Sequence, residues 1–357
     1  MEKQMMLAGG KTAAGPGHFE TFYVQKPEIT KPDDVLFRVT SVGVCGTDVS
    51  IYEWSDTVAK EYHPTLPLVI GHEMAGVVEE VGSAVTKVKP GDYITVNEHI
   101  FCNSCPACAS GRTCVCENRH ILGCQVNGAC TDYIVVREQN CFKLPDNVPL
   151  YAGALAEPLS VAVHAASERL PVQEDDVVVV FGIGMIGLGV CLVALNAGAK
   201  VVAVDIPKAE EHLKIAEEMG AIPVISTPDG IDNILEAIQK CGKERADKSF
   251  DCSGSIPGIR NAIDVVTADG YICEVGIPHR DIPIDVAAHI VYKEKTFLGS
   301  RAFYQATWNK TVKLMGECAD MLDKFITHKL PVERFAESID LIKSGEAIRA
   351  IIIPNES

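Results

Sequence analysis

Four cysteines lie close together in the chain, at Cys102, Cys105, Cys108 and Cys116, with the spacing C-x2-C-x2-C-x7-C. Four thiolates this close in sequence can meet at one tetrahedral zinc ion and leave no coordination position open to a substrate. A disulfide cluster is the alternative, but three thiols at regular intervals suit one metal ion better than two bridges. The pattern therefore predicts a structural zinc site in a cysteine-rich lobe.

A second set of metal-binding residue types is spread more widely: Cys45, His72 with Glu73, and Glu157. A thiolate, an imidazole and a carboxylate with one water molecule would form an open zinc site, which could polarise an alcohol and lower its pKa. The simpler alternative is that Cys45 is a small buried hydrophobe and His72 a core histidine. The spacing alone leaves both interpretations open.

The segment Gly182-Ile183-Gly184-Met185-Ile186-Gly187 has the pattern G-x-G-x-x-G. It follows the apolar run Val177–Phe181 and opens a helical segment, which is the context in which the pattern predicts dinucleotide binding. Gly182 allows the tight turn, Gly184 lets the backbone approach a pyrophosphate, and Gly187 lets helix and strand pack closely. We expect Gly182, Gly184, Ile186 and Gly187 to surround the cofactor.

Asp205 ends the next predicted strand. A carboxylate there can accept hydrogen bonds from both ribose hydroxyls of NAD and would repel the 2′-phosphate of NADP. Lys208 nearby keeps NADP as the alternative. If no cofactor binds, the glycines form a plain tight turn and Asp205 caps a helix.

Residues 1–157 are predicted to be rich in β-structure, with strands at Val35–Val39, Gly76–Val81 and Tyr93–Val96 and a loop around metal at Cys102–Cys124. After Pro158 strands and helices alternate, which indicates a parallel sheet with helices on both faces. The expected elements there are a helix at 159–170, strands at 177–181, 200–204, 223–225, 248–252 and 271–276, and helices at 182–197, 210–219, 231–241 and 256–266. Beyond residue 299 we expect one helix at 311–325 and a closing strand at 349–353.

The chain has 357 residues, which suits two domains, and its composition of 47% hydrophobic and 22% charged residues is that of a globular protein. Its net charge of -16 disfavours nucleic acid and anionic membrane surfaces as partners. The opening residues show no secretory leader, and no apolar stretch is long enough to span a membrane. We therefore expect a cytoplasmic protein whose fourteen cysteines stay reduced or bind metal.

Taken in order, five motifs resemble those of the zinc-dependent medium-chain alcohol and polyol dehydrogenases, most closely the sorbitol, butanediol and threonine dehydrogenase branch. They are Cys45-Gly46-Thr47-Asp48, Gly71-His72-Glu73, the four-cysteine segment, Glu157-Pro158-Leu159-Ser160-Val161 and the glycine pattern. The resemblance implies an α/β fold: a GroES-like domain at 1–157, a Rossmann NAD-binding domain at 158–299, and a return to the first domain at 300–357.

The resemblance also implies roles. Cys45, His72 and a glutamate would hold the catalytic zinc; Glu157 is the ligand in polyol-type members, and Glu73 lies close and exchanges with it. Thr47 would pass on the alcohol proton. Many members have a histidine three residues after that threonine, where this chain has Ser50. This difference weakens the similarity to threonine dehydrogenases.

The expected activity is reversible oxidation of a secondary alcohol with NAD, the substrate being a polyol, a vicinal diol or a sugar-derived alcohol. L-Threonine and phosphorylated or amino sugars are alternative substrates, and a non-catalytic dinucleotide-binding protein is an alternative of a different class. Two zinc ions per chain are expected, and the family pattern selects Cys116 over Cys114. Family habit implies a homodimer or homotetramer, with 269–284 as an edge strand that pairs across a two-fold axis.

Other residues complete the expected site. Ser50, Tyr52 and Trp54 are candidates for the substrate pocket, although at least one of the aromatic residues could belong to the core. Val275, Gly276 and Arg301 are expected to contact the cofactor, and Arg301 could equally contact a polar substrate or lie in solvent.

Overall fold

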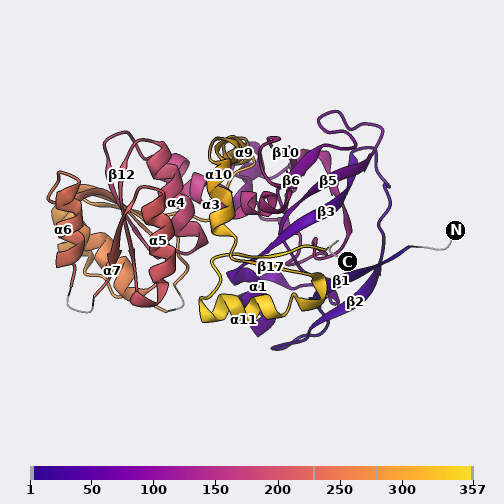
Figure 1. Cartoon of the computed structure of the whole chain (residues 1–357), viewed down its shortest axis with the longest axis horizontal. Helices are drawn as coiled ribbons and strands as arrows, with labels where there is room; N and C mark the ends of the chain where they lie inside the picture. The colour runs from indigo at the N-terminus through magenta and orange to yellow at the C-terminus, as the bar shows by residue number, and fades with distance from the viewer. Residues whose placement is uncertain (1–3, 228–229, 279, 355–357) are drawn as a thin grey trace. The chain divides into compact units, whose positions relative to one another are not determined.

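A computed structural model describes residues 4–227, 230–278 and 280–354 of the chain (Figure 1). The chain divides into two compact units. One unit comprises the residues up to Glu157 together with those from Tyr304 onward, and the other comprises Pro158–Phe303. The first unit is therefore made of two segments that are distant in sequence.

The first unit is built on two sheets. The smaller sheet has the order β2-β1-β4, and the larger has the order β10-β6-β5-β3-β18-β17, with β9 also pairing with β3. Their strands are β1 (Met5–Lys11), β2 (Phe19–Gln25), β3 (Asp34–Val44), β4 (Leu68–Val69), β5 (Glu73–Val81), β6 (Tyr93–Val96), β9 (Tyr133–Arg137), β10 (Cys141–Lys143), β17 (His328–Leu330) and β18 (Ala350–Ile352). Because β18 pairs antiparallel with β3, the end of the chain completes the sheet that its beginning started.

The helices of this unit lie around the sheets: α1 (Gly46–Glu53), α9 (Thr307–Glu317), α10 (Ala319–Phe325) and α11 (Glu337–Ser344). The single helix expected at 311–325 is in fact two, because the backbone leaves helical geometry at Cys318, where φ is -120° and ψ is 29°. The expected loop at 102–124 contains the short helix α2 (Pro106–Ala109) and the strand β8 (His120–Ile121), which pairs with β7 (His99–Ile100).

The second unit contains a six-stranded sheet in the order β13-β12-β11-β14-β15-β16. All of its strand pairs are parallel. The strands are β11 (Val177–Phe181), β12 (Lys200–Asp205), β13 (Ile222–Ile225), β14 (Ala246–Asp251), β15 (Val266–Glu274) and β16 (Thr296–Gly299). This order is that of a doubly wound dinucleotide-binding fold, which confirms the predicted α/β class.

Helices cover both faces of this sheet. Figure 1 shows α4 (Met185–Asn196) and α5 (Glu210–Glu218) on one side and α6 (Asp232–Lys240) and α7 (Ile256–Val265) on the other. The side chains of β11 are buried throughout, which explains its uninterrupted run of apolar residues. Two further helices are α3 (Ala156–His164) and the short α8 (Val286–His289).

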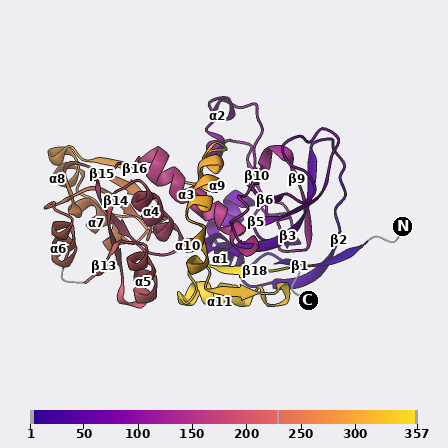
Figure 2. The ribbon, with the colours of Figure 1, turned by 45° about the horizontal axis from the view of Figure 1, so that its top comes forward.

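The expectation of an edge strand within 269–284 is wrong. Residues 269–274 belong to β15, which pairs with β14 on one side and with β16 on the other (Figure 2). The strand at this edge of the sheet is β16 instead. It has four residues and no clear alternation of apolar and polar side chains, so it does not stand out in the sequence.

No helix in the described part of the chain is long and apolar enough to cross a membrane.

Gly187 and Gly184 allow a matched test of packing at the first turn of α4. A Cβ atom on Gly187 would lie 1.9 Å from the carbonyl oxygen of Gly182, whereas one on Gly184 would meet nothing within 4 Å. We expect Gly187→Ala to lower the free energy of unfolding by about 1–3 kcal/mol, since overpacking shifts the backbone, while Gly184→Ala leaves it unchanged. Thermal unfolding of the two variants followed by circular dichroism checks this, and equal melting temperatures would contradict it.

Candidate metal centres

The four cysteines of the 102–116 segment come together in space. Their Sγ atoms all lie within 4.8 Å of one another. The Sγ atom of Cys102 is 3.9 Å from that of Cys108 and 3.6 Å from that of Cys116. Sulfurs that share a tetrahedral zinc at the usual bond length are about 3.8 Å apart. Cys114 is not part of this group.

The electrostatics of the lobe also fit a cation. Hydrogen bonds from Ser104 and from backbone N–H groups lower the pKa of Cys102 to about 5. Burial and the neighbouring sulfurs of Cys105 and Cys116 raise the pKa of Cys108 to about 12. The four thiols cannot all ionise side by side unless a positive charge compensates them, and a zinc ion would supply it.

The second centre begins where β3 ends. Cys45 is the N-cap of α1, and its Sγ accepts a hydrogen bond from the backbone N–H of Thr47 at 3.2 Å. The carboxylate of Asp48 accepts one from the N–H of Cys45 at 2.9 Å, which closes a capping box. The helix N-terminus thus fixes the position of the thiol, while burial, opposed by the charge of His72, raises the pKa of Cys45.

His72 enters the same site from the turn before β5. Gly71 has a φ of 95°, which glycine adopts without strain, and it turns the chain so that His72 is buried. The Nε2 atom of His72 lies 3.1 Å from the Sγ of Cys45. Nitrogen and sulfur ligands of one tetrahedral zinc are about 3.6 Å apart, so a small relaxation would accommodate the ion.

Two glutamates complete this centre. Ligand atoms of His72, Glu73 and Glu157 lie within 4.8 Å of one another. Glu73 Oε1 forms an ion pair with Arg349 at 3.0 Å, while its Oε2 is buried and has no hydrogen-bond partner among the described residues. Burial and the charge of Glu73 raise the pKa of Glu157 to about 7. A buried site with this surplus of acidic groups fits a bound cation.

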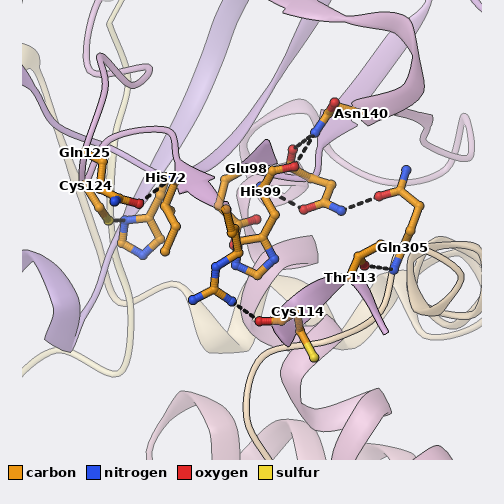
Figure 3. A network of polar contacts seen from close by, with 12 residues as sticks. His72, Glu98, His99, Thr113, Cys114, Cys124, Gln125, Asn140 and Gln305 are labelled. Atoms are coloured by element: carbon orange, nitrogen blue, oxygen red, sulfur yellow. Dashed lines mark hydrogen bonds and ion pairs between the residues drawn. The ribbon is translucent and has the colours of Figure 1, made fainter. Parts of the chain in front are cut away.

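Three residues at this centre were missed in the sequence. The Oδ1 atom of Asp48 lies 3.7 Å from the Nδ1 atom of His72. The Sγ atom of Cys124 lies 3.9 Å from the same nitrogen, as Figure 3 shows. Arg349 is buried and also donates to the carbonyl of Val44 at 2.6 Å. Asp48 could have been found as the N3 residue of a capping box, but nothing in the sequence links Cys124 or Arg349 to His72.

The charges on His72 work against each other. Burial lowers its pKa, but the negative groups of Cys45, Cys124 and Asp48 outweigh burial and raise it well above the usual value. The ring thus has thiol or acidic neighbours at both nitrogens, which orients it as metal-binding histidines are oriented.

The candidate pocket residues all come from α1 and its end. Ser50 donates its hydroxyl to the carbonyl of Gly46 at 3.1 Å. Tyr52 packs edge-on against Phe19, with ring centroids 5.2 Å apart. Trp54 adopts a left-handed conformation at the C-cap and packs against an apolar cluster. The two aromatic rings thus contribute to packing within the first unit.

The glycine turn of the second unit adopts the expected geometry. Gly182 has a φ of 81°, and Gly184 is the N-cap of α4. The carboxylate of Asp205 accepts hydrogen bonds from the backbone N–H groups of Ile183 at 2.5 Å and Ile206 at 2.7 Å. It therefore lies beside the glycine turn, at the carboxyl end of β12.

The other expected cofactor residues lie at the same edge of the sheet or near it. Val275 and Gly276 follow β15, and their N–H groups both donate to the carbonyl of Asp251, at 2.8 and 2.9 Å. Gly276 lies so close to Gly254 that a Cβ would be 2.2 Å from the Gly254 nitrogen. Arg301 follows β16 and is exposed.

The cysteine lobe allows a matched test, in which the same Cys→Ser substitution is made inside and outside the four-sulfur group. We expect Cys105→Ser to remove about one zinc ion per chain and to lower the melting temperature, because the three remaining thiolates hold the ion less well. Cys114→Ser, in the same lobe but outside the four-sulfur group, should retain the full zinc content. Elemental analysis of both purified variants distinguishes the cases, and a zinc loss caused by Cys114→Ser would show that the ligand set is wrong.

Comparison with known proteins agrees with this architecture. Residues 31–146 match the family described as "Alcohol dehydrogenase GroES-like domain", and residues 185–317 match "Zinc-binding dehydrogenase". An L-threonine 3-dehydrogenase of Symbiobacterium thermophilum is 33% identical over 99% of both chains, and a D-arabitol-phosphate dehydrogenase of Enterococcus avium is 30% identical over 97% of both. The crystal structure of 2R,3R-butanediol dehydrogenase from Bacillus subtilis superposes with a TM-score of 0.85 at 29% identity, covering 99% of this chain and 100% of that one. The chain belongs to the zinc-dependent medium-chain alcohol and polyol dehydrogenase family.

Proposed function

We propose that this enzyme oxidises a secondary alcohol of a polyol or vicinal diol to a ketone, with zinc and NAD. The observation that carries the proposal is the convergence of Cys45, His72, Glu73 and Glu157 on one buried, acidic centre in the first unit. The four-cysteine lobe is a separate centre with no ligand other than sulfur. One zinc ion per chain is thus structural and the other catalytic.

The two glutamates, Glu73 and Glu157, have different neighbours, and this suggests different roles. Arg349 neutralises Glu73 and engages its Oε1. Gly43 makes room for the other oxygen, since a Cβ there would lie 2.0 Å from Glu73 Oε2. We assign Cys45, His72 and Glu157 as the resting zinc ligands, with Glu73 held close by Arg349 as the residue that can exchange. A zinc ion held by these residues would polarise an alcohol oxygen and favour loss of its proton.

Thr47 is placed to accept that proton. It lies in the first turn of α1, two residues from Cys45, and is half-buried. A hydroxyl both donates and accepts, so it can take a proton from the substrate and pass it on. Ser50 does not continue the relay in this conformation, because its hydroxyl donates back to Gly46 within the same helix.

The second unit would bind the cofactor. The turn at Gly182–Gly187 presents the N-terminus of α4 to a pyrophosphate, and Val275, Gly276 and Arg301 would extend the site along the edge of the sheet. NAD supplies the hydride acceptor. Asp205 favours NAD, because its carboxylate is oriented by two backbone N–H groups and would repel a 2′-phosphate.

Asp205 provides the test of cofactor choice. We expect Asp205→Ser to weaken NADH binding about tenfold, because the acceptor for the ribose hydroxyls is lost. The difference in affinity between NADH and NADPH should also become smaller, because the charge that repels the 2′-phosphate is lost. Fluorescence titration with both reduced cofactors measures this. An unchanged ratio of the two dissociation constants would contradict the assignment.

The charge of the catalytic centre favours a neutral substrate. With zinc bound and His72 neutral as its ligand, the four negative groups Cys45, Asp48, Glu73 and Glu157 would face three positive charges from Arg349 and the ion, so the phosphate of a sugar phosphate would gain no net attraction close to the reacting carbon. L-Threonine remains the second candidate, because several relatives share that activity by name. Ser50, at the position where many members have a histidine, weighs against it.

The decisive experiment measures NADH formation at 340 nm with polyols, vicinal diols, sugar phosphates and L-threonine. We expect turnover of a polyol or diol that is lost on chelation. The His72→Ala variant should have a turnover rate lower by at least about a thousandfold. It should still bind NADH, because His72 belongs to the first unit and the proposed cofactor residues belong to the second. Turnover of threonine alone would replace the substrate assignment, and full activity of a zinc-depleted His72→Ala protein would overturn the mechanism.

We propose further that the enzyme is a cytoplasmic homodimer or homotetramer. No disulfide joins the cysteines of the described chain, which fits a reducing compartment. The edge strand β16 and its surroundings expose apolar side chains, including Phe297, Tyr292 and Val291. An exposed apolar edge of this kind is typical of a surface that pairs with a second copy.

A further inference from the structure

Glu98 is a buried carboxylate that the zinc ligand set does not use. It lies between β6 and β7 and is only 2% exposed. Its Oε1 is 3.2 Å from the Nε2 of His99, whereas its Oε2 is buried with no hydrogen-bond partner among the residues that the structure describes. An unsatisfied buried acceptor is costly, so it calls for an explanation.

The backbone around Glu98 is held rigidly. The side-chain amide of Asn140 donates to the carbonyls of Asn97 at 2.6 Å and His99 at 2.9 Å, on either side of Glu98. The carbonyl of Glu98 itself accepts from the N–H of Leu122 at 3.0 Å. Figure 3 shows this network. The carboxylate is therefore preorganised, as a recognition group must be.

Strand pairing and charge effects both indicate that Glu98 lies beside the proposed catalytic centre. Burial raises its pKa well above the usual value, and the strongest charge effect comes from Glu157, which raises it further. His72 and Arg119 act in the opposite direction. Because β6 pairs antiparallel with β5, with Thr95 opposite Ala75, the residues that follow β6 lie beside His72 and Glu73.

We propose that Glu98 is a specificity-determining residue: its Oε2 accepts a hydrogen bond from a hydroxyl group on the carbon next to the reacting one. This inference rests on the proposed function and names the feature that the enzyme recognises, a second hydroxyl. A site built to bind a hydroxyl discriminates strongly against a substrate that lacks it, because its own polar group is then left unpaired.

The chemistry of the surroundings decides which donor fits. An ionised carboxylate has no hydrogen to donate to Oε2, and a phosphate dianion has none either. An ammonium group could also donate to Oε2, and it gains more from a charged acceptor than a hydroxyl does. The Glu98→Gln substitution keeps an acceptor oxygen but removes the ionisable acid. It therefore distinguishes binding of a substrate hydroxyl group from binding of a substrate ammonium group.

The experiment compares 2,3-butanediol, 2-butanol and 3-amino-2-butanol, which differ only in the group next to the reacting carbon. In Glu98→Ala we expect kcat/KM for the diol to fall about 10–100-fold, mainly through KM, while that for 2-butanol changes less than about threefold. In Glu98→Gln the diol should keep most of its activity. Equal losses of kcat/KM for the diol and for 2-butanol would mean a structural role and would overturn the proposal. A wild-type enzyme that prefers the amino alcohol to the diol, and loses this preference in Glu98→Gln, would overturn it as well.

Two controls keep the outcomes distinct. Glu80→Gln removes an exposed carboxylate on β5 and should change none of the three substrates. Zinc content, NADH affinity and melting temperature of the Glu98 variants show that the fold and the metal sites are intact. If the wild-type protein turns over no alcohol of the larger panel, the proposed function is wrong. If it turns over 2,3-butanediol and 2-butanol and the Glu98 variants have the same kcat/KM values, only the role of Glu98 is wrong.

Discussion

The structure depends on the balance of buried charge at the Cys45–His72 centre. A thiol and several carboxylates are removed from water there, which is unfavourable unless positive charge compensates them. The described side chains supply His72 and Arg349, and a divalent cation would supply the rest. The surplus of acidic groups is therefore what fits this centre to hold such an ion.

The first unit holds this charge in place through elements that come from both ends of the chain. Cys45 is fixed by the N-terminus of α1, and His72 and Glu73 by the glycine turn before β5. Arg349 arrives on the segment that leads into β18, which pairs with β3. Because β3 also precedes Cys45, the strand pairing brings the compensating cation to the site. Loss of the C-terminal strand would therefore expose Glu73 as an unpaired charge.

The region around Glu98 illustrates how rigidity is distributed. The side-chain amide of Asn97 donates to the side-chain oxygen of Gln305, and the amide of Asn140 donates to the backbone carbonyl of Asn97. The backbone N–H of Gln305 donates to the hydroxyl of Thr113 in the cysteine lobe. The lobe and the catalytic centre are thus connected by polar contacts within one unit. A structural zinc site can therefore support catalysis by fixing the backbone from which Glu98 projects.

The sequence by itself determined the fold class, the paired metal motifs and the glycine turn, because each depends on residues close together in the chain or on a regular alternation of apolar runs. The strand at 177–181 was predicted to the residue. Tertiary structure decided what depends on distant contacts: the split of 311–325 at Cys318, the edge position of β16, and the placement of Asp48, Cys124 and Arg349 around His72. It also decided that Glu98 is buried with an unpaired oxygen. Burial and charge balance arise from segments that meet only in space, and no local pattern records them.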